Sequence, residues 1–334
     1  MLLFPQFLQE TTGISPQFTD SALTLQWFAV MMVNENWMMG FWKTYCSKEK
    51  KGDISMVRIV SDTSTLYSSQ QARAAGFAVS PLSVTIAGKT YREFDEISSP
   101  DFTGIIRQGH LPVSSQPAVG QVVELYEEFA EHDIVNIAMA AGLSGTYDTA
   151  VTAREICENR DRITVINSRT LCGPPRYLVE KATEWAKNGL SAKEIVERVE
   201  QQMATAKSFL MPADFDYLRR GGSLSPLVSY VVKMAGLVPV MTQTEDGRHL
   251  TIAGVRRGFP QGVKFVAKAL EKLGVGRGWR VYITHADALQ VAESARRELL
   301  NTIPNAVYEI LPLSPAFITQ GGPGCVAIQA IAEA

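Results

Sequence analysis

The stretch that decides the fold is Ala140-Ala141-Gly142-Leu143-Ser144-Gly145-Thr146-Tyr147. It follows the apolar run 134–138, which is typical of a short buried strand, and it precedes 148–157, where apolar and small residues recur at helical spacing. A loop at such a junction exposes backbone N–H groups at the positive end of a helix dipole. The pattern therefore indicates either a binding site for an anionic head group or a simple helix cap.

Four residues of this loop are candidates for contact with a ligand. Gly142 and Gly145 let a ligand approach the backbone closely, because neither carries a side chain. The hydroxyls of Ser144 and Thr146 are donors that rotate. We expect these hydroxyls mainly to hold the loop, while backbone N–H groups contact the ligand.

A second loop, 113–120, leads into the segment 121–131, whose apolar residues share one face. Ser115 or Gln116 is expected to cap this helix, and Pro117 suits the first turn, where a missing N–H costs nothing. The loop indicates a capped helix or a second site of ligand contact.

Seven motifs, in order from about Met56 to the C-terminus, resemble those of the DegV family of bacterial fatty-acid-binding proteins. They are VRIVSDTS at 57–64, SSQP at 114–117, GLSGTY at 142–147, DYLRRGG at 216–222, VRRG at 255–258, HAD at 285–287 and GPG at 322–324. The resemblance implies a two-lobed α/β fold that binds a long acyl chain between its lobes.

The resemblance also implies which residues meet the carboxylate of a fatty acid. The family uses a Thr in the first loop, a Ser just before the second loop and a His in the terminal motif. These positions hold Ser114, Ala141 and Gln320 in this chain, and the neighbouring candidates are Ser115, Gly142, Ser144 and Gly145. Ser114 keeps a hydroxyl, Ala141 has lost one, and Gln320 forms hydrogen bonds but cannot become a cation. Head-group capture is therefore expected to be weaker than in typical members.

A further family position concerns a protein partner. Members that pass their fatty acid to a fatty acid kinase have an Arg after Gly-Gly, and this chain has Ser223 there. Arg219 and Arg220 lie close in sequence and are candidates to replace it. The resemblance thus implies a fatty acid kinase as partner, although the residues available for contact with it differ from those of the family.

Composition narrows the function further. The chain has 334 residues, 46% of them hydrophobic, and a net charge of −2, which favours a globular protein with no electrostatic reason to bind nucleic acid. Its four cysteines and four histidines show no metal-ligand spacing, so we expect reduced thiols, no metal and a cytoplasmic location. Neither a phosphate-binding P-loop nor a Gly-x-Gly-x-x-Gly motif occurs, and no cofactor is expected.

Residues 1–55 lie before the first family motif. The segment 23–42 is apolar, but Gln26, Asn34, Glu35 and Asn36 interrupt it, which argues against stable membrane insertion. The extension is interpreted either as an additional helix or as sequence upstream of the true start. It lacks the basic beginning of a signal peptide.

Strand-like and helix-like runs alternate from Met56, which predicts an α/β fold with a mainly parallel sheet. The runs 238–244 and 249–255 flank an Asp-Gly pair, which predicts a hairpin in a second, α+β lobe with an antiparallel or mixed sheet. We therefore divide the chain into 1–55, an α/β lobe at 56–215 and an α+β lobe at 216–334. The loops at Asp62, Ser114 and Gly142 should gather at the carboxyl ends of the parallel strands.

Three functions follow from these observations. The first is a non-enzymatic carrier of a long-chain fatty acid, whose carboxylate lies near Ser114 and the Gly142 loop. The second is a phosphotransferase-like enzyme acting on a small polar ligand, although no carboxylate cluster for Mg²⁺ is visible. The third is an interaction protein that has lost its ligand, which the changes at Ala141, Gln320 and Ser223 favour.

Overall fold

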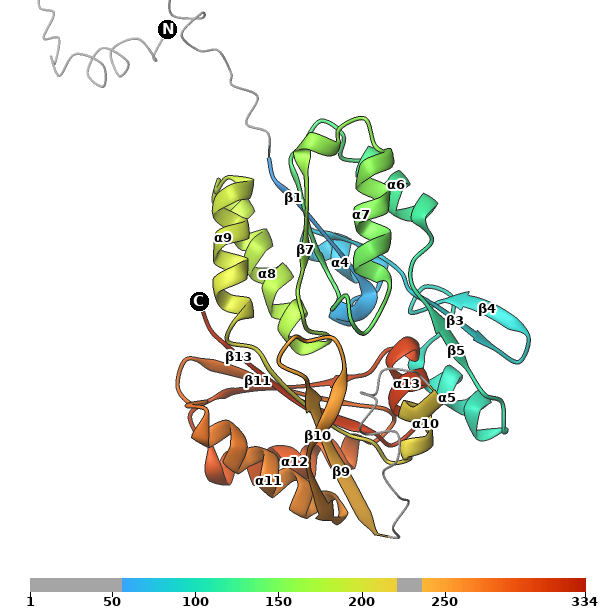
Figure 1. The fold of residues 1–334 in the computed structure, drawn as a ribbon, viewed down its shortest axis with the longest axis vertical. Helices are drawn as coiled ribbons and strands as arrows, with labels where there is room; N and C mark the ends of the chain where they lie inside the picture. The colour runs from blue at the N-terminus through green and yellow to red at the C-terminus, as the bar shows by residue number, and fades with distance from the viewer. Residues whose placement is uncertain (1–55, 221–235) are drawn as a thin grey trace, which may run out of the picture. The chain divides into compact units, whose positions relative to one another are not determined.

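The computed structural model describes residues 56–220 and 236–334, which belong to one compact unit, Met56–Ala334. The N-terminal extension 1–55 lies outside the described residues, and so does most of the apolar run 225–237, for which the sequence predicts a helix. Figure 1 shows two main sheets, with helices packed against each of them.

The first sheet is entirely parallel, as the alternating pattern predicts. Its strands, in spatial order, are β2 (Ala78–Ser80), β1 (Arg58–Asp62), β6 (Ile134–Ala138) and β7 (Ile163–Asn167). Every residue of β6 is buried, because helices cover both faces of this strand.

Helices cover the two faces of the first sheet. One face packs against α4 (Ser69–Ala75), α8 (Gly173–Lys187) and α9 (Ala192–Met203), and the other against α6 (Val119–Glu127) and α7 (Thr146–Ile156). Capping boxes start α4 and α9, with Ser68 paired to Gln71 and Ser191 to Glu194. Short 3₁₀ turns occupy Thr63–Thr65 and Arg160–Arg162.

The second sheet is mixed. Its order is β10 (Leu250–Arg257), β9 (Leu237–Gln243), β8 (Lys207–Met211), β13 (Val326–Ala332), β11 (Trp279–His285) and β12 (Val307–Pro312). Only β11 and β12 are parallel, and β9 and β10 form the predicted hairpin. Two helices, α11 (Gly258–Lys272) and α12 (Leu289–Thr302), pack on one face, while α8 contacts the other face through Tyr177 and Tyr282.

A small third sheet, absent from the sequence-based prediction, lies beside the other two. It contains β4 (Lys89–Arg92), β3 (Ser83–Ile86) and β5 (Val113–Ser115), and it neighbours α5 (Ser99–Arg107) and α13 (Pro315–Gly321). The sequence predicts a single strand at 79–86, after Gly76, and this prediction is wrong. The segment forms two strands in two sheets, because Pro81 interrupts the ladder between β2 and β3.

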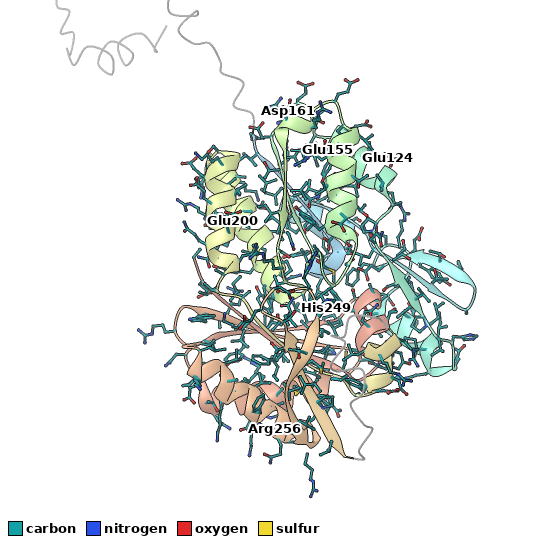
Figure 2. All side chains as sticks on the ribbon, viewed as in Figure 1. Glu124, Glu155, Asp161, Glu200, His249 and Arg256 are labelled. Atoms are coloured by element: carbon teal, nitrogen blue, oxygen red, sulfur yellow. The ribbon has the colours of Figure 1, made fainter. Side chains whose placement is uncertain are left out.

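The lobe boundary at 215/216 stays a prediction. Strand β8 already belongs to the second sheet, so the sheets change before residue 207. The next helix, α10 (Phe215–Arg220), packs against α13. Figure 2 shows His249 at the tip of the β9–β10 hairpin that is directed toward the first sheet, whereas Glu124, Glu155 and Glu200 are exposed on α6, α7 and α9.

Candidate functional site

The buried Asp62 joins the carboxyl ends of β1 and β6. Its Oδ1 accepts a hydrogen bond from the Ser64 N–H at 2.8 Å, and its Oδ2 accepts one from the Met139 N–H at 2.9 Å. Burial raises the pKa of this carboxyl, although the hydrogen bonds oppose the shift. The end of the first family motif therefore contacts the segment that leads into the third motif at this edge of the parallel sheet.

Ser114 lies in β5, not in a helix cap. It pairs with Val84, and it is half-buried while Val113 and Ser115 are exposed, as alternation along a strand requires. Ser115 therefore faces away from Ser114. The expected cap at Ser115 or Gln116 is wrong: α6 begins after Ala118, which makes no side-chain cap.

Gln320 meets Ser114 across 206 positions of the sequence. Its Nε2 donates to Ser114 Oγ at 3.1 Å. Gln320 is held there because it lies at the end of α13, which packs against β5, β3 and α5. The structure thus brings together two of the three predicted head-group residues.

The Gly142 loop is packed between two other segments. A Cβ on Gly142 would lie 2.0 Å from the Arg248 Cα in the β9–β10 turn, so no larger residue fits without moving the backbone. A Cβ on Gly145 would lie 3.0 Å from the Gln116 side chain. Both glycines therefore allow close packing of the loop: Gly142 against the β9–β10 hairpin, and Gly145 against the segment after Ser114.

Several donors of this loop are already used inside the protein. The Ala141 N–H donates to Asn167 Oδ1 at 3.2 Å, and the N–H groups of Leu143 and Ser144 donate to the Ala140 carbonyl. The hydroxyls of Ser144 and Thr146 share a hydrogen bond at 2.7 Å. These two hydroxyls bind each other and so hold the loop. A role for Ala141 in head-group contact stays a prediction.

A cavity opens between the carboxyl ends of the first sheet and one face of the second. It contains about 700 Å³ of empty space, part of it open to solvent. Its walls are mostly apolar, and they include Met139, Leu143, Leu171, Leu210, Leu218, Met241, Leu250, Leu313, Phe317 and Ala327. Alternation along β13 helps to produce this wall: Ala327 lines the cavity, whereas its neighbour Ile328 packs in the core under α11 and α12. Gln320 lines the same cavity, so the Ser114–Gln320 pair lies at its edge.

Comparison with known proteins identifies the family. A family model described as "Uncharacterised protein, DegV family" matches residues 56–333. The chain belongs to the DegV family. A DegV domain-containing protein of Caldanaerobacter subterraneus subsp. tengcongensis is 28% identical over 274 residues, covering 81% of this chain and 94% of the relative.

Two solved DegV structures share the fold. One, from Thermus thermophilus, is described as showing fatty acid binding; it has a TM-score of 0.75 at 24% identity, covering 83% of this chain and 99% of that protein. The other, from Bacillus subtilis, is described as a fatty acid binding protein; it has a TM-score of 0.74 at 24% identity, covering 84% and 100%.

A buried carboxyl that sequence reasoning missed supports the cavity wall of this DegV chain. Glu93 is fully buried and accepts hydrogen bonds from the Thr63 hydroxyl and, at 2.8 Å, from the Ala316 N–H. It therefore ties the end of β1 to the start of α13, the helix that carries Gln320. Burial raises the pKa of Glu93 to about 7. Its neighbourhood, Tyr-Arg-Glu-Phe-Asp-Glu, is typical of a solvated surface, so no sequence signal marked it.

The expected partner-binding residues lie on and after α10. Arg219 and Arg220 are exposed; Arg219 is 3.7 Å from Asp216, and the Arg220 guanidinium stacks 4.5 Å from the centre of the Tyr217 ring. The Tyr217 ring in turn lies against Gly322 of the terminal motif. Ser223 lies outside the described residues.

Two further features would point to other functions: a metal site and a membrane-spanning helix. Residues 56–220 and 236–334 contain no cluster of three metal-ligating side chains. No helix in these same ranges is long and apolar enough to cross a bilayer. His285 has a structural role, because its Nδ1 accepts from the Ala288 N–H at 3.2 Å.

Proposed function

We propose that this protein binds a long-chain fatty acid without transforming it. The observation that carries the proposal is the apolar cavity with the Ser114–Gln320 pair at its edge. Each buried CH₂ contributes about 0.8 kcal/mol, so an acyl chain in such a cavity supplies most of the affinity. The two DegV structures described as fatty acid binding support the same ligand. An apolar wall does not suit the small polar ligand of a phosphotransferase.

The test is direct identification of bound lipid. Lipid extracted from the purified protein and analysed by mass spectrometry should contain fatty acid, and labelled oleate should show saturable binding. Ala327→Phe places a ring in the cavity from the central strand β13 and should weaken oleate binding at least tenfold. Ala204→Phe, at an exposed position after α9, is the matched control and should leave binding unchanged. Empty extracts together with non-saturable oleate uptake would reject the proposal.

We further propose that the fatty acid is presented to a separate kinase in the cytoplasm. Arg219 and Arg220 are exposed on α10, which packs against the helix that carries Gln320, so a partner docked there reaches the cavity edge. The described cysteines, Cys157, Cys172 and Cys325, are unpaired, as suits a reducing compartment. Arg220→Ala should slow phosphorylation of bound oleate by a purified fatty acid kinase while oleate affinity stays constant. Equal rates for both proteins would exclude Arg220 from docking.

A further inference from the structure

The polar groups along the cavity wall differ in how fully they are paired. Gln329 is satisfied: its Nε2 donates to the Leu171 carbonyl and to Ser208 Oγ, and its Oε1 accepts from the Gly173 N–H. The Thr242 hydroxyl donates to the Ser208 carbonyl at 2.9 Å. These groups form hydrogen bonds within the protein that hold the sheet, so they have few donors or acceptors left for a ligand.

Gln320 differs from the other lining residues. Its Nε2 donates to Ser114, but its Oε1 is buried and has no hydrogen-bond partner in the described part of the chain. Among the described residues, none of the others that line the cavity has such an atom. Leaving a buried acceptor unpaired destabilises the empty site, so this carbonyl favours a ligand that brings a donor.

The same wall carries no formal charge. No Lys, Arg, His, Asp or Glu occurs among the described residues that line the cavity. Its two thiols, Cys172 and Cys325, are fully buried, and burial raises their pKa values far enough to keep them protonated at neutral pH. A carboxylate held against this wall would meet no opposite charge and would face the lone pairs of Gln320 Oε1.

We infer that this cavity takes a long-chain lipid whose head group is uncharged and carries a hydrogen-bond donor. The inference rests on the proposed function and refines it: a fatty acid enters as the neutral acid. Its O–H donates to Gln320 Oε1, and its carbonyl accepts from the second N–H of the same amide. A primary fatty amide presents the same donor and acceptor pair at every pH.

The experiment compares three oleoyl ligands at pH 6 and pH 8 by displacement of a fluorescent lipid. Oleamide is uncharged with a donor, methyl oleate is uncharged without one, and oleic acid titrates. We expect oleamide to bind equally at both pH values and about 2- to 12-fold more tightly than methyl oleate, which corresponds to one net hydrogen bond. Oleic acid should weaken about tenfold per pH unit, because its neutral fraction falls by that factor above its ordinary pKa.

Oleamide also serves as the reference for the titratable and charged protein groups near this end of the cavity. These groups are Glu93 beside α13, Tyr217 with Arg219 and Arg220 on α10, and the two thiols. Protonation of these groups acts on uncharged oleamide as it acts on the neutral acid, so the ratio of oleic acid to oleamide affinity isolates the ionisation of the head group. The variant Gln320→Leu should abolish the preference for oleamide over methyl oleate, whereas Gln201→Leu, exposed on α9, should preserve it.

Two results separate this inference from the proposed function. If oleic acid binds at pH 8 as tightly as oleamide, the amide of Gln320 presents Nε2 to a carboxylate, and the inference is overturned while fatty acid binding stands. If none of the three ligands binds saturably at either pH, the proposed function itself is wrong. An unchanged preference in Gln320→Leu would likewise remove Gln320 from the head-group site.

Discussion

Replacing Glu93 by Gln should change how the stability of this protein depends on pH. Glu93 is fully buried between Thr63 and Ala316, and burial raises its pKa from the ordinary 4.5 to about 7. Between about pH 4.5 and pH 7, the folded state therefore keeps a proton on Glu93 that the unfolded state has already released. The stabilisation is fully present below about pH 4.5 and is lost as the pH rises through about 7.

The size of this effect follows from the two pKa values. The difference between about 7 and 4.5 corresponds to about 3 kcal/mol in the free energy of unfolding. Gln cannot ionise, and its amide can donate to the Thr63 hydroxyl while its oxygen accepts from the Ala316 N–H. We therefore expect the stability of Glu93→Gln, relative to the native protein, to increase by about 3 kcal/mol between pH 4.5 and pH 8.

Urea unfolding at several pH values measures this difference directly. Burial also shifts the pKa of two other groups. It raises the pKa of Asp62, whose effect on stability has the same sign as that of Glu93, and it lowers the pKa of His285, whose effect has the opposite sign. Both are present in each protein, so the comparison of variant with native protein largely removes them. Parallel stability curves for the two proteins would refute the reasoning.

Two further predictions concern the loops. Gly142→Ala should lower the free energy of unfolding by more than about 1 kcal/mol in urea, because its Cβ would lie 2.0 Å from the Arg248 Cα. The control is Gly120→Ala in α6, where a Cβ would have nothing within 4 Å. This change should be neutral or should stabilise the protein by up to about 1 kcal/mol. Ser114→Ala should weaken oleamide binding about 2- to 12-fold in ligand displacement, since Gln320 loses the acceptor that orients it, whereas the exposed Ser294→Ala should not. Equal stabilities for the two glycine variants, or equal affinities for the two serine variants, would contradict these expectations.

Local sequence patterns predicted much of the fold. The run 134–138 predicts a strand with the bounds that the structure shows, because its five consecutive apolar or amide residues suit a strand buried on both faces of a parallel sheet. The Asp-Gly pair located the β9–β10 hairpin, since a tight turn needs a residue such as Gly247, whose φ is +69°. The three-stranded sheet was missed, because strands of three or four residues are too short to show a period.

The sequence by itself determined the family, the parallel sheet and the residue types at the cavity edge. Only the tertiary structure decided that Ser114 and Gln320, 206 positions apart, share a hydrogen bond, and that Glu93 is buried against Thr63 and Ala316. The physical reason is that periodicity reports which face of one element is apolar. Which polar atoms end up paired or unpaired, and hence how Glu93 titrates and what Gln320 can bind, depends on elements from distant parts of the chain.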